Sequence, residues 1–168
     1  MSTVHLHLLL NHVPVIGTII GLCLLAWAVF RKDQGLARAT LGLFAVLAAV
    51  ALATFLTGEP AEEAVEGLAG VSEGAIESHE EAALLATIAL GVLGTASLGA
   101  LVWFRRHALP RRVMALMLVL ALVPAGAMAW TAHLGGQIRH SELRAEGPET
   151  VPDVQMAQQG GEEADEDR

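Results

Sequence analysis

Residues 4–30 read "VHLHLLLNHVPVIGTIIGLCLLAWAVF", a run without Asp, Glu, Lys or Arg. It exceeds the length of about 20 helical residues that crosses a hydrocarbon core. Residues 36–57, 82–104 and 113–134 form three further runs that are almost free of charge. Of the 168 residues, 54% are hydrophobic and the mean hydropathy is +0.52, a composition typical of membrane proteins. The sequence predicts an all-α integral membrane protein, an antiparallel four-helix bundle.

Residues 1–140 are expected to form one membrane domain, and residues 141–168 an acidic tail. The tail holds nine acidic residues against two arginines. It cannot bury enough apolar surface to fold alone, so we predict that it is disordered. No Lys or Arg precedes Arg31, so the first span lacks the basic start of a secretory signal and is expected to remain in the mature protein. No internal repeat stands out beyond a loose resemblance between the two predicted hairpins.

The basic residues cluster on one side of the predicted bundle. Seven of the ten lie where the first two spans meet or where the last two meet: Arg31, Lys32, Arg38, Arg105, Arg106, Arg111 and Arg112. By the positive-inside rule this side faces the cytoplasm, which puts both termini outside. Nine of the ten basic residues are Arg, which favours a bacterial source and the inner membrane as the location.

Local patterns predict where three of the spans begin or end. Ser78 and Glu81 fit a capping box at the start of the third span, with Ser78 as its first capping residue. Gly58 is expected to end the second span, with Pro60 just beyond it. Gly135 is expected to end the fourth span in the same way.

Histidines gather at the outer ends of three predicted helices. These are His5, His7, His12, His79, His133 and His140, six of the seven in the chain. His12 is the one that must lie within the span, so we expect the bundle to shelter it. Pro14 leaves the carbonyl of Leu10 without its helical donor and loosens this turn. A neutral His12 bonded to a carbonyl or to a glutamate of the outer loop is the alternative to a ligand role.

The most plausible cofactor ligands are His12, His79 and His133. A metal site could use a larger set, in which glutamates of the outer loop cover the histidines: His5, His7, His12, His79, His133, Glu59 and Glu63. The loop at residues 58–81 holds eight glutamates and no basic residue, so a solvated acidic surface is the alternative explanation for its carboxylates. No catalytic residue is predicted.

The segment "TAHLGGQIRH", residues 131–140, together with the histidines of the first span and His79, resembles a family of small four-helix bacterial membrane proteins that is defined as a domain of unknown function. In that family a "GHLGG"-like segment closes the last helix. The resemblance covers residues 5 to 140 and implies the four-helix topology and a haem- or redox-associated role. The chain departs from the family's usual opening, in which a His-Pro pair precedes a second histidine, and its outer loop is unusually acidic.

Three functions follow from these observations. Two histidines from different helices could ligate a haem b for electron transfer, without covalent attachment because no CxxCH motif is present. Alternatively, a non-haem site could bind Fe, Cu or Zn, or the chain could be a non-enzymatic membrane subunit or pH-responsive sensor. Membrane lipids and a redox or membrane-complex partner are expected. The net charge of −8 argues against nucleic-acid binding.

Overall fold

The computed structural model describes residues 3–62 and 73–139. Within these ranges the chain forms four long helices and one short one. The long helices are α1 (Thr3–Arg31), α2 (Gln34–Leu56), α4 (Glu73–Trp103) and α5 (Arg111–Arg139), and the short one is α3 (Gly58–Glu62). Each long helix is long and apolar enough to cross a membrane. The predicted all-α fold with four spans is confirmed, and the chain is a multi-pass membrane protein.

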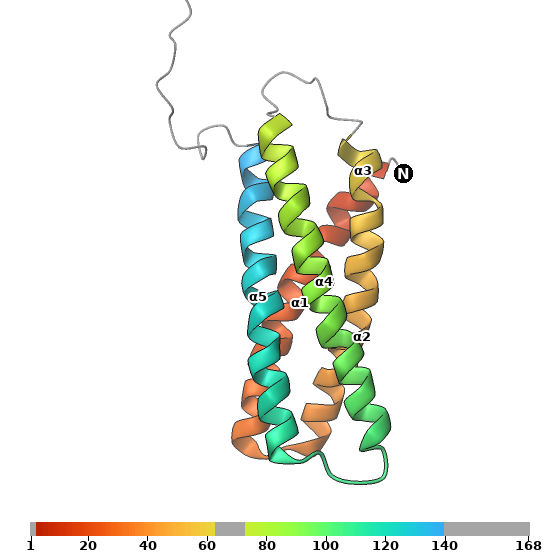
Figure 1. Ribbon diagram of the computed structural model, residues 1–168, viewed down its shortest axis with the longest axis vertical. Coiled ribbons are helices and arrows are strands. Elements are labelled where there is room, and N and C mark those ends of the chain that lie inside the picture. Colours follow the sequence, from red (N-terminus) through yellow and green to blue (C-terminus); the bar gives the residue numbers. More distant parts are fainter. Residues whose placement is uncertain (1–2, 63–72, 140–168) are drawn as a thin grey trace, which may run out of the picture.

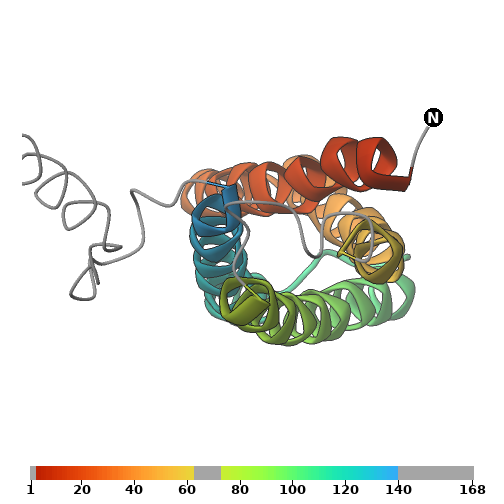
Figure 2. The ribbon, with the colours of Figure 1, turned by 90° about the horizontal axis from the view of Figure 1, so that it is seen from above.

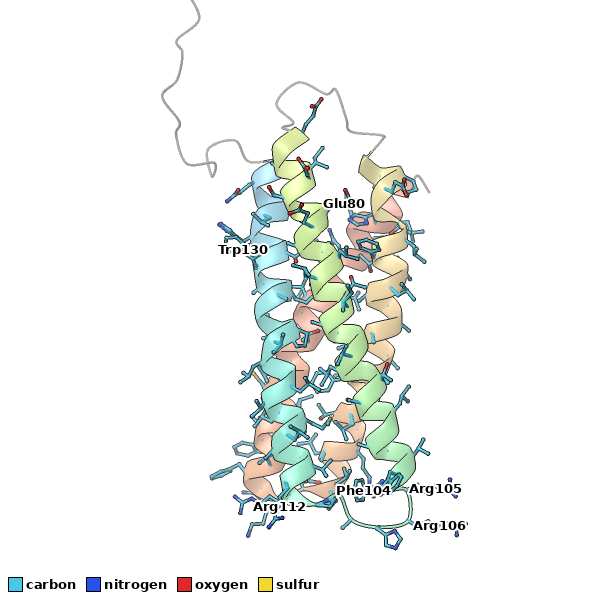
Figure 3. The ribbon with its side chains drawn as sticks, in the orientation of Figure 1. Glu80, Phe104, Arg105, Arg106, Arg112 and Trp130 are labelled. Carbon is cyan, nitrogen blue, oxygen red and sulfur yellow. The ribbon has the colours of Figure 1, made fainter. Side chains whose placement is uncertain are left out.

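The four long helices pack as a ring in the order α1, α2, α4, α5, so that α5 closes against α1 (Figures 1 and 2). Consecutive long helices run antiparallel (Figure 1). One end of the bundle carries both short connections and the side chains of Arg105, Arg106 and Arg112 (Figure 3). We call it the arginine end. At the opposite end α1 and α4 begin and α2 and α5 finish, and we call this the histidine end.

Large apolar side chains cover the outside of the bundle. Trp103 is 81% exposed, Phe30 76% and Leu56 67%. A helix with apolar residues all around it is typical of a membrane span, because lipid rather than water meets its outer face. The exposed apolar surface therefore supports the assignment as a membrane protein.

The third span begins earlier than the capping box predicts. Helix α4 starts at Glu73, and Ser78 lies inside it, where its hydroxyl donates to the carbonyl of Gly74 at 2.8 Å. The prediction of Ser78 as the capping residue is therefore wrong. Two features stabilise the extra turn: Glu73 interacts favourably with the positive end of the helix dipole, and Ile76 is buried against the bundle.

The last span ends later than its glycines predict. Helix α5 continues through Gly135 and Gly136 to Arg139, so Gly135 is not its end. Tertiary packing overrides the weak helix propensity of glycine here, because Gly135 lies against the ring of His79. The second span ends where predicted: α2 finishes at Leu56, and Gly58 opens the short helix α3.

Two side chains of α2 form hydrogen bonds with the connection between α4 and α5 at the arginine end. The Arg38 guanidinium donates to the carbonyls of Phe104 and His107, at 2.8 and 2.6 Å. The Gln34 amide donates to the Leu109 carbonyl at 3.1 Å and accepts from the Leu109 N–H at 2.7 Å. These bonds satisfy backbone groups that the helices leave unpaired.

The hairpins α1–α2 and α4–α5 repeat one pattern of burial. All five described buried positions of α1 match buried positions of α4 at a constant sequence spacing. The pairs are Pro14 with Ala86, Thr18 with Leu90, Gly21 with Leu93, Leu25 with Ser97, and Ala28 with Ala100. Six of the seven buried positions of α2 match α5 likewise: Ala37 with Met114, Thr40 with Met117, Phe44 with Ala121, Leu47 with Pro124, Ala51 with Met128, and Thr54 with Thr131.

The repeat relates residues whose side-chain types mostly differ. The two hairpins run in the same direction, and matched helices lie diagonally across the ring, α1 from α4 and α2 from α5 (Figure 2). This order is the one expected for an approximate twofold axis along the bundle, as in membrane proteins with parallel internal repeats. Residues at matching positions of the two hairpins therefore face the shared interior from opposite sides.

Candidate ligand site at the histidine end

His7 of α1 forms a hydrogen bond with the end of α2. It is half-buried, and its Nδ1 lies 3.2 Å from the carbonyl oxygen of Thr54 and 3.3 Å from Oγ1 of Thr57. The Thr57 hydroxyl itself donates to the Thr54 carbonyl at 2.8 Å, so its oxygen is free to accept. A carbonyl only accepts, so Nδ1 of His7 carries the proton and donates.

His79 of α4 makes the matching contact with α5. Its Nδ1 lies 3.0 Å from the carbonyl oxygen of Thr131, the residue that pairs with Thr54 in the repeat. The same reasoning puts the proton on Nδ1. Among the described residues, Nε2 of His7 and Nε2 of His79 have no hydrogen-bond partner. Each Nε2 thus keeps a lone pair that can bind a metal or accept a proton.

A glycine lies beside each imidazole. Gly58 comes four residues after Thr54, and Gly135 comes four residues after Thr131. A Cβ atom on Gly135 would lie 3.0 Å from Cε1 of the His79 ring, and one on Gly58 would lie 3.7 Å from Cε1 of His7. Absence of a side chain at Gly135 therefore lets the ring of His79 approach the backbone of α5. The unit of histidine, threonine carbonyl and glycine occurs once in each hairpin.

The two imidazoles share one region of the bundle. Their bonds to the Thr54 and Thr131 carbonyls place both near the last turns of α2 and α5, which finish at the histidine end. Alanines are the commonest buried residues around this end, among them Ala51, Ala82 and Ala86. Small side chains let helices and ligands approach closely in a membrane bundle. The histidine pair is therefore set among residues that occupy little volume.

Asn11 adds a polar atom to the same region. It follows His7 by four residues on α1, so the two side chains share one face of that helix. Its Oδ1 is buried and accepts no hydrogen bond from any of the described residues. This oxygen is therefore available to accept a hydrogen bond from a ligand at the histidine end.

His12 is not sheltered by the bundle, so that expectation is wrong. It is exposed, and its Nδ1 lies 3.1 Å from the carbonyl of Leu8 in its own helix. The physical reason is helical geometry: His7 and Asn11 face the interior, and His12 points well away from that direction. The contact with the Leu8 carbonyl is the alternative that the sequence left open, a His12 bonded to a backbone carbonyl.

His133 also faces outward. It is exposed, its Nε2 lies 3.0 Å from Nε2 of Gln137, and its ring centroid lies 5.6 Å from that of Trp130. Figure 3 shows Trp130 pointing away from the bundle. The structure therefore brings neither His12 nor His133 to His79, and the histidine that matches His79 in the repeat is His7.

The wider set of predicted metal ligands is dispersed. His5 and Glu59 are exposed, while Glu63 and His140 lie outside the described residues. Over residues 3–62 and 73–139, no group of three or more His, Cys, Asp or Glu side chains could hold a metal ion. Comparison with models of known protein families, with curated proteins and with solved structures finds no match to the chain. The family resemblance therefore stays a prediction.

Sequence reasoning included His7 among the metal ligands but missed its pairing with His79. The pattern that would have found it is the repeated spacing from threonine to glycine, Thr54 to Gly58 and Thr131 to Gly135. The position of Asn11 on the same helical face as His7 was a second indication. Both require knowing which helices are neighbours, which the ring order supplies.

Proposed function

We propose that the histidine end binds haem b, with His7 and His79 as its two axial ligands, and that the protein transfers electrons. The observation that carries this proposal is the repeated pair of imidazoles, each held through Nδ1 by a carbonyl of the next helix. Ligating histidines characteristically donate their other ring N–H to such a group, which fixes the ring and increases its basicity.

The number of donors favours haem over a non-haem metal. A haem iron takes four ligands from the porphyrin and needs only two from the protein, whereas structural zinc sites need four protein ligands and catalytic ones three. Two imidazoles match the first requirement. When bound, haem supplies one-electron redox chemistry.

The residues of the chain would hold and orient the group. The Thr54 and Thr131 carbonyls fix the proton on Nδ1 of each histidine, and so leave both Nε2 lone pairs available to a ligand. Alanine and glycine around the rings limit the side-chain volume that a macrocycle would displace. Asn11 offers an acceptor that has no partner among the described residues.

The experiment is a reduced-minus-oxidised absorption spectrum of the full chain purified in detergent. We expect the band of a low-spin b-type haem. His7→Ala and His79→Ala should each abolish this band, because each removes one of the two axial ligands. His12→Ala and His133→Ala are matched controls, since both histidines are exposed, and they should keep it.

Two outcomes would contradict the proposal. One is a protein without any chromophore, and elemental analysis that then finds Fe, Cu or Zn would favour the non-haem alternative. The other is a band that survives in both His7→Ala and His79→Ala. If neither haem nor metal is found, a non-enzymatic subunit or sensor is the better account, and the two histidines serve to join neighbouring helices.

Location and partners are part of the same proposal. The arginine-rich connections favour an orientation in which the histidine end faces the outside of a bacterial inner membrane, with both termini on that side. A haem near that surface would exchange electrons with a redox partner there. The resemblance to the small four-helix bacterial family is compatible with this role.

A further inference from the structure

A cavity of about 190 Å³ lies at the arginine end, at the opposite end of the bundle from His7 and His79. It is formed where the turn between α1 and α2 meets the start of α5. Five residues line it: Val29, Lys32, Gln34, Arg111 and Met114. The cavity therefore joins two segments that are distant in sequence, and each of them contributes one cation.

The lining divides into an apolar part and a cationic part. Val29 and Met114 are apolar, with Met114 buried and Val29 partly buried. The amide of Gln34 is occupied, because it bonds the N–H and the carbonyl of Leu109. Lys32 and Arg111 are exposed, so both charges remain available to a ligand. A group that fits must combine a negative charge with hydrocarbon.

The cavity lies at the level of the membrane surface. Exposed aromatic side chains surround this end of the bundle, among them Trp27, Phe30 and Trp103. Aromatic residues gather at the boundary between hydrocarbon and headgroups. Arg105, Arg106 and Arg112 extend from the same end (Figure 3). Lipid phosphates are therefore the anions found at the depth of the cavity.

Lys32 occupies a backbone position that favours glycine. Its φ is 58°, in the left-handed region, and it follows the end of α1. The Asp33 N–H returns to the carbonyl of Ala28 at 3.0 Å, as in the turn that commonly ends a helix with glycine. A charged side chain is thus retained beside the cavity at a conformational cost.

We propose that this cavity binds the headgroup of an anionic phospholipid. Lys32 and Arg111 contact the phosphate oxygens, and the first carbons of the lipid lie against Val29 and Met114. Inorganic phosphate shares the charge but lacks the hydrocarbon. The proposal is independent of haem binding at the histidine end.

The test is lipid binding by the full chain, measured by native mass spectrometry in detergent with added phosphatidylglycerol or phosphatidylcholine. We expect phosphatidylglycerol to bind more tightly. Lys32→Gly and Arg111→Gln should each weaken its binding about fivefold, the effect of one basic residue near a lipid headgroup. Lys32→Gly also suits the left-handed turn, so a loss of binding cannot be attributed to unfolding, and its melting temperature should not fall.

Arg106→Gln is the matched control, because Arg106 carries the same charge at the same end but does not line the cavity. It should leave phosphatidylglycerol binding unchanged. Equal weakening by Arg106→Gln, or full binding by both cavity variants, would overturn the proposal. If inorganic phosphate binds the wild-type chain as tightly as phosphatidylglycerol does, the cavity is a phosphate site and the lipid assignment is wrong.

Discussion

The two halves of the bundle are built from different residues. We take residues 18–44 and 89–124 as the arginine half, and the remaining described residues as the histidine half. The ten largest side chains with less than 2% exposure all lie in the arginine half, Phe44 and Leu25 among them. In the histidine half alanine is the commonest buried residue, and two histidines and Asn11 lie in its interior.

The two halves differ in how their interiors are filled. Large interlocking side chains stabilise the arginine half, where Gln34 and Arg38 also satisfy the backbone of the adjoining connection. Both halves bury polar side-chain atoms that have no partner among the described residues: Asn11 Oδ1 in the histidine half, and the hydroxyls of Thr18 and Ser97 in the arginine half. Such atoms cost free energy in either half. What distinguishes the histidine half is its two imidazoles, each bonded through Nδ1 and each with an Nε2 that has no partner among the described residues. These imidazoles point to a role in binding.

The largest expected effect is the loss of Phe44. Its side chain is 0% exposed and fills the space beside Gly21, where an added Cβ would lie 2.5 Å from its ring. Phe44→Ala should lower the free energy of unfolding by about 3–5 kcal/mol, as expected for a buried Phe. Thermal unfolding in detergent measures this. Trp103→Ala, at an 81% exposed position, is the control and should change the melting temperature little.

The next largest effect is expected for Gln34, whose side-chain amide both donates and accepts a hydrogen bond. Gln34→Leu removes two hydrogen bonds to Leu109 and leaves its buried backbone groups unpaired. We expect a loss of about 1–3 kcal/mol in the free energy of unfolding. The same unfolding measurement applies. A melting temperature equal to that of the wild type would mean that these bonds do not stabilise the arginine half.

The smallest effect is expected for Asn11, whose side-chain oxygen accepts no hydrogen bond from any described residue. Asn11→Leu replaces a buried Oδ1 that has no partner among the described residues by an apolar group of similar size. In haem-free protein we expect no loss of stability, and a gain of up to about 1 kcal/mol. Together with Gln34→Leu, this variant tests whether a buried amide stabilises the histidine half as it stabilises the arginine half. A loss as large as that of Gln34→Leu would show that Asn11 serves the fold.

The fold was predictable because it depends on long apolar runs. The four spans follow from charge-free stretches such as residues 4–30. The apolar composition that identifies a span stays the same whether its helix gains or loses one turn at an end. Helix ends were harder. Gly135 has the sequence of a helix end, but its contact with His79, a residue of another helix, keeps it inside α5. No local pattern carries that information.

The site was predictable only in part. Six histidines at one end suggested a binding region, but which of them face inward depends on how α1 rotates against its neighbours. His7 and His12 are five residues apart in the sequence, and packing leaves His7 half-buried and His12 exposed. The repeat that pairs His7 with His79 is visible in burial rather than in residue identity, because most matched positions hold different side chains.

In the proposed site, His7 and His79 together hold one haem. Titration of haemin into the haem-free chain, followed by absorbance and by electron paramagnetic resonance, tests it directly. We predict one haem per chain with the signature of two imidazole ligands, and no specific binding by the double variant His7→Ala/His79→Ala. A double variant that binds haemin as the wild-type chain does, or a wild-type chain that binds none, would contradict the account.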